Sequence, residues 1–204
     1  MRRILVVMAE SSVAERLRSE LCPPLEERIA ARLHECFLLD TLEKARSAPD
    51  AQLMVAYSPD EPIPSVRDCA PFVDGYIRLD ENDSRSVEGV FSELSAPDRS
   101  VVILDSDSPT LPAMCLELAF GVLDSERVDI VLGPCEGGGC YLVGMRGRRP
   151  DIWDRFDWNA PDAVGTMIER CAENRLDWFL LPEWHAFSRS ADLACIRGEL
   201  TERM

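Results

Sequence analysis

The feature that most constrains the fold is a short unbroken apolar run, residues 101–104, that ends at Asp105, Ser106 and Asp107. The run is rich in β-branched residues, which is typical of a strand buried on both faces of a largely parallel sheet. Open α/β sheets bind their ligands at the carboxyl ends of such strands. The two aspartates are therefore predicted to lie where a ligand would bind.

Two carboxylates separated by one residue also suit a Mg²⁺ or Mn²⁺ ion that holds a diphosphate. Such a hard cation takes one or two protein oxygens and completes its shell with phosphate and water. A second interpretation is that Asp105 and Asp107 only cap a helix, because Asp and Ser are preferred N-cap residues and Ser108-Pro109 opens a predicted helix. The residues alone leave both interpretations open.

Apolar runs alternate with helical patterns along the chain. Strands are predicted at residues 2–8, 51–57, 72–79, 101–104, 128–132, 141–145 and 178–181, and helices at 13–21, 23–42, 84–95, 109–123, 161–174 and 192–200. This alternation is typical of a mostly parallel sheet with helices on both faces. We therefore expect one three-layer α/β/α domain over residues 1–204.

The charge balance excludes some partners. A formal net charge of −15 argues against binding to nucleic acid or to an anionic membrane surface. No segment is long and apolar enough to span a bilayer. The N-terminus imitates the start of a signal peptide, but Glu10 follows almost at once and no small-residue cleavage site closes an apolar region. We expect a cytoplasmic protein.

Cysteine, lysine and histidine offer few candidates for chemistry. None of the eight cysteines has the paired short spacing of a structural zinc site. Only Cys135 and Cys140 bracket an unusual motif, the glycine run at residues 137–139. These two cysteines either form a disulfide, bind a soft metal or stay reduced. Lys44 is the single lysine beside twenty-one arginines, and it falls inside a predicted helix. His34 also falls in that helix, where a lone histidine is typical of a surface or boundary residue.

A glycine run between two predicted strands, residues 137–139, is the second unusual feature. Without a Cβ, glycines allow backbone N–H groups to approach a phosphate or a sugar closely. The alternative is a plain turn between two strands. The two interpretations carry equal weight on these residues.

A set of stretches resembles a known family in order and spacing over nearly the whole chain. They are residues 37–42 and 55–58, residues 102–111, residues 131–134 with 138–139 and 141–144, and Trp158 with the predicted helix that holds Thr166, before residues 180–182. The chain resembles the small bacterial GT-A-type glycosyltransferase-like proteins. This nucleotide-diphospho-sugar transferase group is often called the radical-SAM/selenodomain-associated transferases.

The resemblance implies where a nucleotide-sugar donor would bind. The base and phosphates would contact the loop after the first strand, with Ala9, Glu10 and Arg16. The metal, Mg²⁺ or Mn²⁺, would bind at Asp107, and Asp105 supplies a second carboxylate where the family usually has glycine. The acceptor would lie near the family's Asp-Gly-Gly-Tyr motif, whose glycines fall on Gly138 and Gly139.

The sequence also departs from the family pattern. The Lys-Thr-Arg-Leu signature of the first loop falls on residues 14–17, where only the arginine and leucine survive. The motif aspartate falls on Gly137, and a C-terminal Asp-x-Asp-Thr segment falls on residues 186–189. Two neighbours offer partial replacement: Glu136 as a catalytic base, and His185 as a third metal ligand with Asp105 and Asp107.

These observations leave hypotheses from different classes. The first is a metal-dependent glycosyltransferase or nucleotidyltransferase acting with a nucleotide-diphospho-sugar. The second is a catalytically degenerate relative that binds a nucleotide or a protein partner, and the third is a structural or interaction role, with which a homodimer is compatible. The motifs favour the transferase-like interpretation, and whether the chain is an enzyme stays open at this point.

Overall fold

The computed structural model describes residues 1–9, 21–22, 25–48, 50–57, 67–79, 87–148 and 150–187. The elements are β1 (Arg2–Ala9), α2 (Glu27–Ala45), β2 (Ala51–Tyr57), β3 (Gly75–Arg78), α4 (Val87–Leu94), β4 (Arg99–Asp105), α5 (Ala113–Asp124), β5 (Ile130–Pro134), β6 (Cys140–Arg146), η1 (Pro150–Trp153), α6 (Ala163–Asn174) and β7 (Trp178–Leu180). The helix predicted at 192–200 and residues 13–20 of the helix predicted at 13–21 lie outside the described residues.

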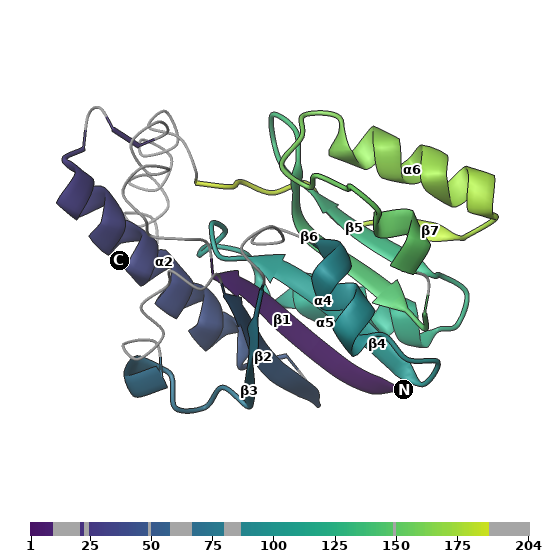
Figure 1. Ribbon diagram of the computed structural model, residues 1–204, viewed down its shortest axis with the longest axis horizontal. Helices are drawn as coiled ribbons and strands as arrows, with labels where there is room; N and C mark the ends of the chain where they lie inside the picture. The colour runs from purple at the N-terminus through teal and green to yellow at the C-terminus, as the bar shows by residue number, and fades with distance from the viewer. Residues whose placement is uncertain are drawn as a thin grey trace.

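All the strands among the described residues join one seven-stranded sheet, in the order β3-β2-β1-β4-β6-β5-β7 (Figure 1). The pairs are parallel except those of β6, which runs antiparallel to both β4 and β5. The chain leaves β1 toward β2 and later returns to the other side of β1 as β4. The predicted mostly parallel α/β fold is confirmed, and β1 and β4 flank the point where the strand order reverses.

Alternating side chains of the central strands fill two separate apolar cores. Ile4 and Val6 of β1 pack in the core that contains the buried residues of α4 and α6. Leu5 and Val7 pack in the core that contains Leu38 and Leu42 of α2 and the buried residues of α5. Figure 1 shows these helices on opposite faces of the sheet, which gives the predicted three layers.

The helix after β4 begins later than the sequence predicts. α5 starts at Ala113, and its N-cap is Pro112, which has an extended backbone and makes no side-chain capping bond. A residue that precedes proline is disfavoured in the helical conformation, and Pro109 and Pro112 together delay the helix. The prediction of a helix from residue 109 was wrong, and Asp105 and Asp107 do not cap α5.

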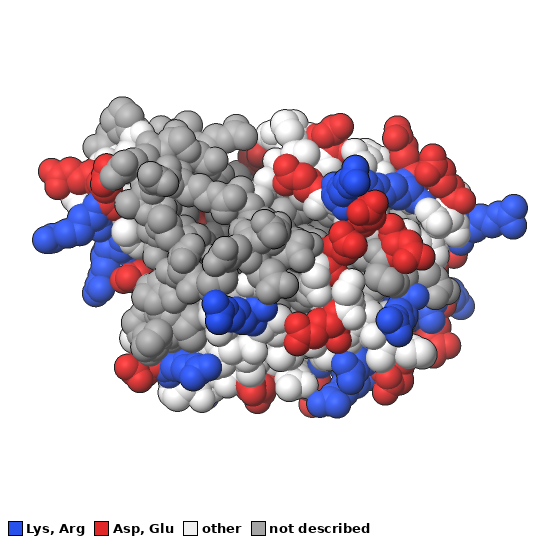
Figure 2. Space-filling view, viewed as in Figure 1, with Lys and Arg blue, Asp and Glu red and all other residues white. Residues whose placement is uncertain are grey.

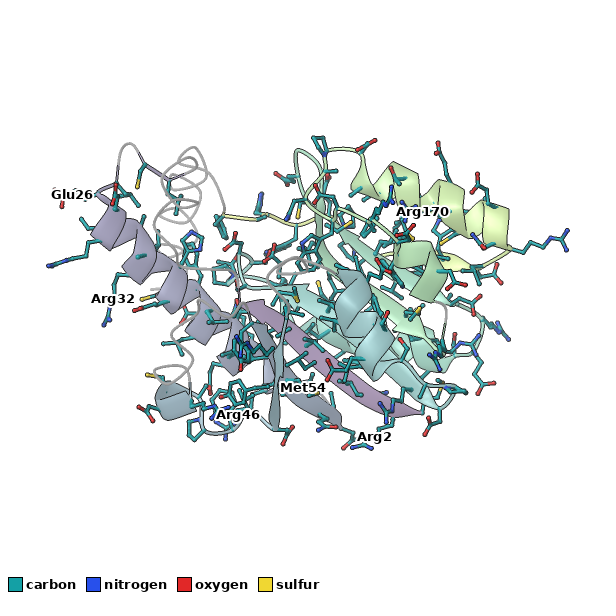
Figure 3. The ribbon with its side chains drawn as sticks, viewed as in Figure 1. Arg2, Glu26, Arg32, Arg46, Met54 and Arg170 are labelled. Atoms are coloured by element: carbon teal, nitrogen blue, oxygen red, sulfur yellow. The ribbon has the colours of Figure 1, made fainter. Side chains whose placement is uncertain are left out.

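The outer surface carries mixed charge. Figure 2 shows acidic and basic side chains interspersed over the described part of one face. Glu26, the N-cap of α2, and Arg32 of α2 point away from the sheet (Figure 3). Arg170 of α6, labelled in the same view, donates hydrogen bonds to Ile152 O at 2.7 Å and Asp154 O at 2.8 Å, which ties α6 to η1. No helix among the described residues is long and apolar enough to cross a membrane.

Candidate functional site

A turn of buried polar residues follows β4 at the centre of the sheet. Residues 105–108 and Thr110 are all buried, and Asp105 and Asp107 are only 4% and 3% exposed. Asp105 lies opposite Met8 in the β1–β4 register, so Ala9, the last residue of β1, is beside this turn. The site occupies the position where open α/β sheets bind their ligands.

Helix α2 holds the turn from one side through three polar side chains. Thr41 Oγ1 donates to Ser106 O at 3.1 Å, and Lys44 Nζ donates to Leu111 O at 3.4 Å. His34 Nδ1 lies 3.3 Å from Asp107 Oδ1. Lys44, the only lysine of the chain, therefore supports the C-terminal end of this turn through the carbonyl of Leu111.

A segment near the C-terminal end of the described chain holds the turn from the other side. Ser108 Oγ donates to His185 O at 3.1 Å, and Phe187 N–H donates to Asp107 O at 2.8 Å. Trp184 Nε1 donates to Thr110 Oγ1 at 3.2 Å. With contacts on both sides, the two aspartates are presented by a fixed backbone.

The carboxylate of Asp107 has acceptor capacity that the described residues leave unused. Asp105 Oδ1 accepts the N–H of Asp107 at 3.4 Å, but the buried Oδ1 of Asp107 accepts no hydrogen bond. A buried polar atom without a partner is costly and calls for an explanation such as an ion. Two carboxylates with this unused oxygen fit the donor set that a hard divalent cation takes from a protein.

Glu136 and His185 form a pair beside this turn. His185 Nδ1 lies 3.1 Å from Glu136 Oε2, and the two side chains are 33% and 57% exposed. The N–H of Glu136 donates to Trp184 O at 2.9 Å, which fixes the two segments together. Among the described residues no group of three His, Cys, Asp or Glu side chains is arranged to hold a metal. The structure thus joins His185 to Glu136, and does not assemble the predicted trio with Asp105 and Asp107.

The glycine run forms the turn between β5 and β6. Gly137, Gly138 and Gly139 have φ of +85°, +107° and +81°, a region that favours glycine. A Cβ at Gly138 would lie 2.7 Å from the Cα and carbonyl oxygen of Pro161. The N–H of Gly138 donates to Cys135 O at 3.1 Å. These contacts account for the glycines as a turn packed on the protein's own backbone, and nucleotide binding by Gly138 and Gly139 stays a prediction.

The two cysteines that bracket this turn are free and buried. Burial, and then the neighbouring Asp105 carboxylate, raises the pKa of Cys135 far above its ordinary value. Burial raises the pKa of Cys140 to about 12. Both groups are therefore protonated thiols at neutral pH, a form that is a poor nucleophile and metal ligand.

The sequence-based prediction missed the polar face that α2 presents to the site. His34 and Thr41 are seven positions apart, which places both on one side of a helix. That spacing could have indicated that both residues face the sheet, because Phe37, Leu38 and Leu42 mark the buried side of the same helix. Of the predicted nucleotide-binding residues, Glu10 and Arg16 lie outside the described part of the chain.

The sequence matches the model of a family described as "Uncharacterized protein conserved in bacteria (DUF2064)" over residues 41–160. The chain belongs to the DUF2064 family. The matched region contains β4, the aspartate turn and the glycine turn, so the site lies largely within what defines the family. No curated protein matches the sequence.

Solved structures share the fold of this DUF2064 protein. A candidate nucleotide-diphospho-sugar transferase from Desulfovibrio desulfuricans is 22% identical over 92% of this chain and 83% of that one, with a TM-score of 0.71. A CMP:2-keto-3-deoxy-manno-octonic acid synthetase complexed with CTP is 12% identical over 100% of both chains, with a TM-score of 0.61. A manganese complex of a Mycobacterium tuberculosis protein is 16% identical over 90% and 89%, with a TM-score of 0.54. The fold is therefore that of the nucleotide-diphospho-sugar transferases, as the resemblance implied.

Proposed function

We propose that this DUF2064 protein is a divalent-metal-dependent glycosyltransferase or nucleotidyltransferase that acts with a nucleotide-diphospho-sugar in the cytoplasm. The observation that carries the proposal is the buried Asp107 carboxylate at the carboxyl end of the central strand, with one oxygen that accepts no hydrogen bond from the described residues. The CTP-bound synthetase and the manganese-bound protein, which share this fold, support it.

The residues of the site have distinct proposed roles. Asp105 and Asp107 bind Mg²⁺ or Mn²⁺, which would neutralise the departing diphosphate when bound. Ala9 at the end of β1, with Glu10 and Arg16, which follow it in sequence, contacts the nucleotide. Glu136 is half exposed next to the turn and accepts a proton from the acceptor hydroxyl.

A second candidate is a protein that binds the nucleotide without turnover. It is favoured by the engagement of Glu136 with His185 at 3.1 Å, because a carboxylate held by a neighbouring side chain is less available to an acceptor hydroxyl. The loss of the family's aspartate at Gly137 points the same way. Release of a nucleoside diphosphate or pyrophosphate from a bound donor distinguishes turnover from binding alone.

Thermal unfolding with a panel of nucleotides and nucleotide sugars, with and without Mn²⁺ or Mg²⁺, tests the proposal. A ligand at about 100 times its Kd adds about 2.7 kcal/mol of stability. For a chain of this size that raises Tm by about 5 to 11 °C. We expect a rise that requires metal and is lost in Asp107→Asn.

The matched control is Asp98→Asn, which removes an exposed carboxylate at the opposite end of β4. This variant is expected to keep the full metal-dependent rise in Tm. A rise that persists in Asp107→Asn, or the lack of any rise with every nucleotide, would contradict the proposed donor site.

A further inference from the structure

Glu136 and His185 are brought together by the backbone as well as by their side chains. The N–H of Glu136 donates to Trp184 O at 2.9 Å, and the N–H of Trp184 donates to Pro134 O at 3.1 Å. An isolated parallel bridge pairs Cys135 with Trp184. The segment after β7 therefore runs beside the end of β5, and this pairing of the backbone sets the two side chains opposite each other.

The imidazole of His185 is positioned beside the aspartate turn. The carbonyl of His185 accepts the hydroxyl of Ser108, the residue after Asp107, at 3.1 Å. The rings of Trp184 and Phe187 lie 5.8 Å and 6.3 Å from that of His185, centroid to centroid. A third of the His185 side chain stays exposed, so the ring is both held in place and accessible to a bound molecule.

The contact with Glu136 determines what each ring nitrogen of His185 can do. Nδ1 lies 3.1 Å from Glu136 Oε2, and a carboxylate next to one ring nitrogen holds the proton of the neutral ring on that nitrogen. A neutral imidazole has one donor and one acceptor nitrogen, so Nε2 is left as the acceptor. This is the arrangement in which a carboxylate orients a histidine that works as a general base.

We propose that His185 is the general base that accepts the proton of the acceptor hydroxyl, with Glu136 as its positioning residue. This role rests on the proposed function, where the same step is assigned to Glu136. The hydroxyl proton moves to Nε2 of His185 while the acceptor oxygen bonds to the sugar carbon. The bond from that carbon to the diphosphate breaks, and its electron pair stays on the diphosphate oxygen. The Glu136 carboxylate then stabilises the imidazolium that has formed.

The chemistry of the side chains favours His185 over its neighbours for this step. An imidazole takes up and releases a proton near neutral pH, as a general base must. The carboxylate of Glu136 has one oxygen facing the ring of His185, which makes it less available to a hydroxyl. The other histidine of the chain, His34, is only 12% exposed and lies 3.3 Å from Asp107, so it belongs to the support of the aspartate turn.

The position of the ring proton tests the pairing without any substrate. Long-range ¹H–¹⁵N NMR of the protein with ¹⁵N-labelled histidine shows which nitrogen of the neutral ring carries the proton. The chain has two histidines, so His185→Gln assigns the signals. We expect the proton on Nδ1 of His185 in the natural chain, and a loss of this preference in Glu136→Ala. Because the Glu136 side chain is 57% exposed, this variant is expected to fold even if His185→Gln does not.

Release of nucleoside diphosphate tests the base itself. The assay uses the nucleotide sugars of the thermal panel, UDP-glucose and GDP-mannose among them, with Mn²⁺ and with water as the acceptor. We expect His185→Gln to lower kcat at least about a hundredfold with little change in KM, since this side chain is not assigned to donor binding. Glu136→Ala is expected to lower kcat as well. Added imidazole is expected to restore part of kcat in His185→Ala, which a purely structural role would not allow.

The matched control is Glu183→Gln, which neutralises an exposed carboxylate two positions from His185 and is expected to leave both the ring proton and kcat unchanged. A natural kcat in His185→Gln, or a neutral His185 ring with its proton on Nε2 in the natural chain, would overturn the base role and leave the transferase standing. No release by the natural chain from any of these donors would overturn turnover, and the base role with it, whichever nitrogen carries the proton.

Discussion

Replacing Gly138 by alanine tests how the glycine turn is held, and Gly137 provides a matched control in the same turn. Both residues have a positive φ, +107° and +85°, so alanine is strained at either position. They differ in the space around the new methyl group. At Gly137 no atom of the described residues lies within 4 Å of a Cβ, whereas at Gly138 the Cα and carbonyl oxygen of Pro161 lie 2.7 Å away.

The magnitude follows from these two contributions. A left-handed backbone conformation costs an alanine about 1 to 2 kcal/mol, and this applies to both variants. Overpacking against a neighbour adds about 1 to 3 kcal/mol, and here the neighbour is backbone, which cannot rotate away. We expect Gly138→Ala to be less stable than Gly137→Ala by about 2 kcal/mol, or about 5 °C in Tm.

Urea unfolding followed by circular dichroism, together with thermal melting, measures the difference. The m-value is expected to stay constant, because neither substitution changes the surface exposed on unfolding. Equal stabilities of the two alanine variants would refute the packing of the turn on Pro161. The glycine run would then be a loose connection between β5 and β6.

Two further predictions concern the residues that support the site and the buried thiols. Thr41→Val removes the hydroxyl that donates to Ser106 O from a side chain that is 1% exposed. The free energy of unfolding should fall by about 1 to 3 kcal/mol, whereas Thr41→Ser should retain most of the natural chain's stability. An unchanged urea midpoint in Thr41→Val would show that this bond contributes nothing. Burial raises the pKa of Cys140 to about 12 and of Cys171 to about 11, above the ordinary thiol value of about 8.5. The stabilisation from the raised pKa of each thiol is fully present below about pH 8.5 and is lost as pH rises toward the folded-state pKa, at about 1.4 kcal/mol per pH unit. Cys171→Ala should make the fall in unfolding free energy between about pH 9 and 11 shallower by about that amount per pH unit, and an identical slope in the variant would refute this origin.

The sheet and the location of the site could be predicted from sequence because both depend on local patterns. The apolar run at residues 101–104 identifies β4, and the two aspartates that end it mark the ligand-binding edge. The start of α5 could not be predicted from the helical pattern alone. Two prolines at positions 109 and 112 override that pattern, and the aspartates consequently belong to an extended turn and not to a helix cap.

The partners of the site residues were harder to predict, because they depend on contacts between distant segments. His34 reaches Asp107 only because α2 packs on the same face as the turn after β4, and no local pattern states that pairing. His185 is near the site as predicted from the resemblance. Its ring is paired with Glu136, however, since the backbone of residue 184 is fixed to that of Pro134 and Glu136.

The short segment from residue 184 to 187 connects the two halves of the site. The side chain of His185 contacts Glu136, its carbonyl accepts the hydroxyl of Ser108, and the N–H of Phe187 holds the carbonyl of Asp107. We expect that a molecule which displaces His185 from Glu136 also shifts the backbone that holds Asp107. Coupling of this kind is reciprocal in free energy. We therefore expect a molecule bound against Glu136 and an ion bound at Asp107 to change each other's affinity.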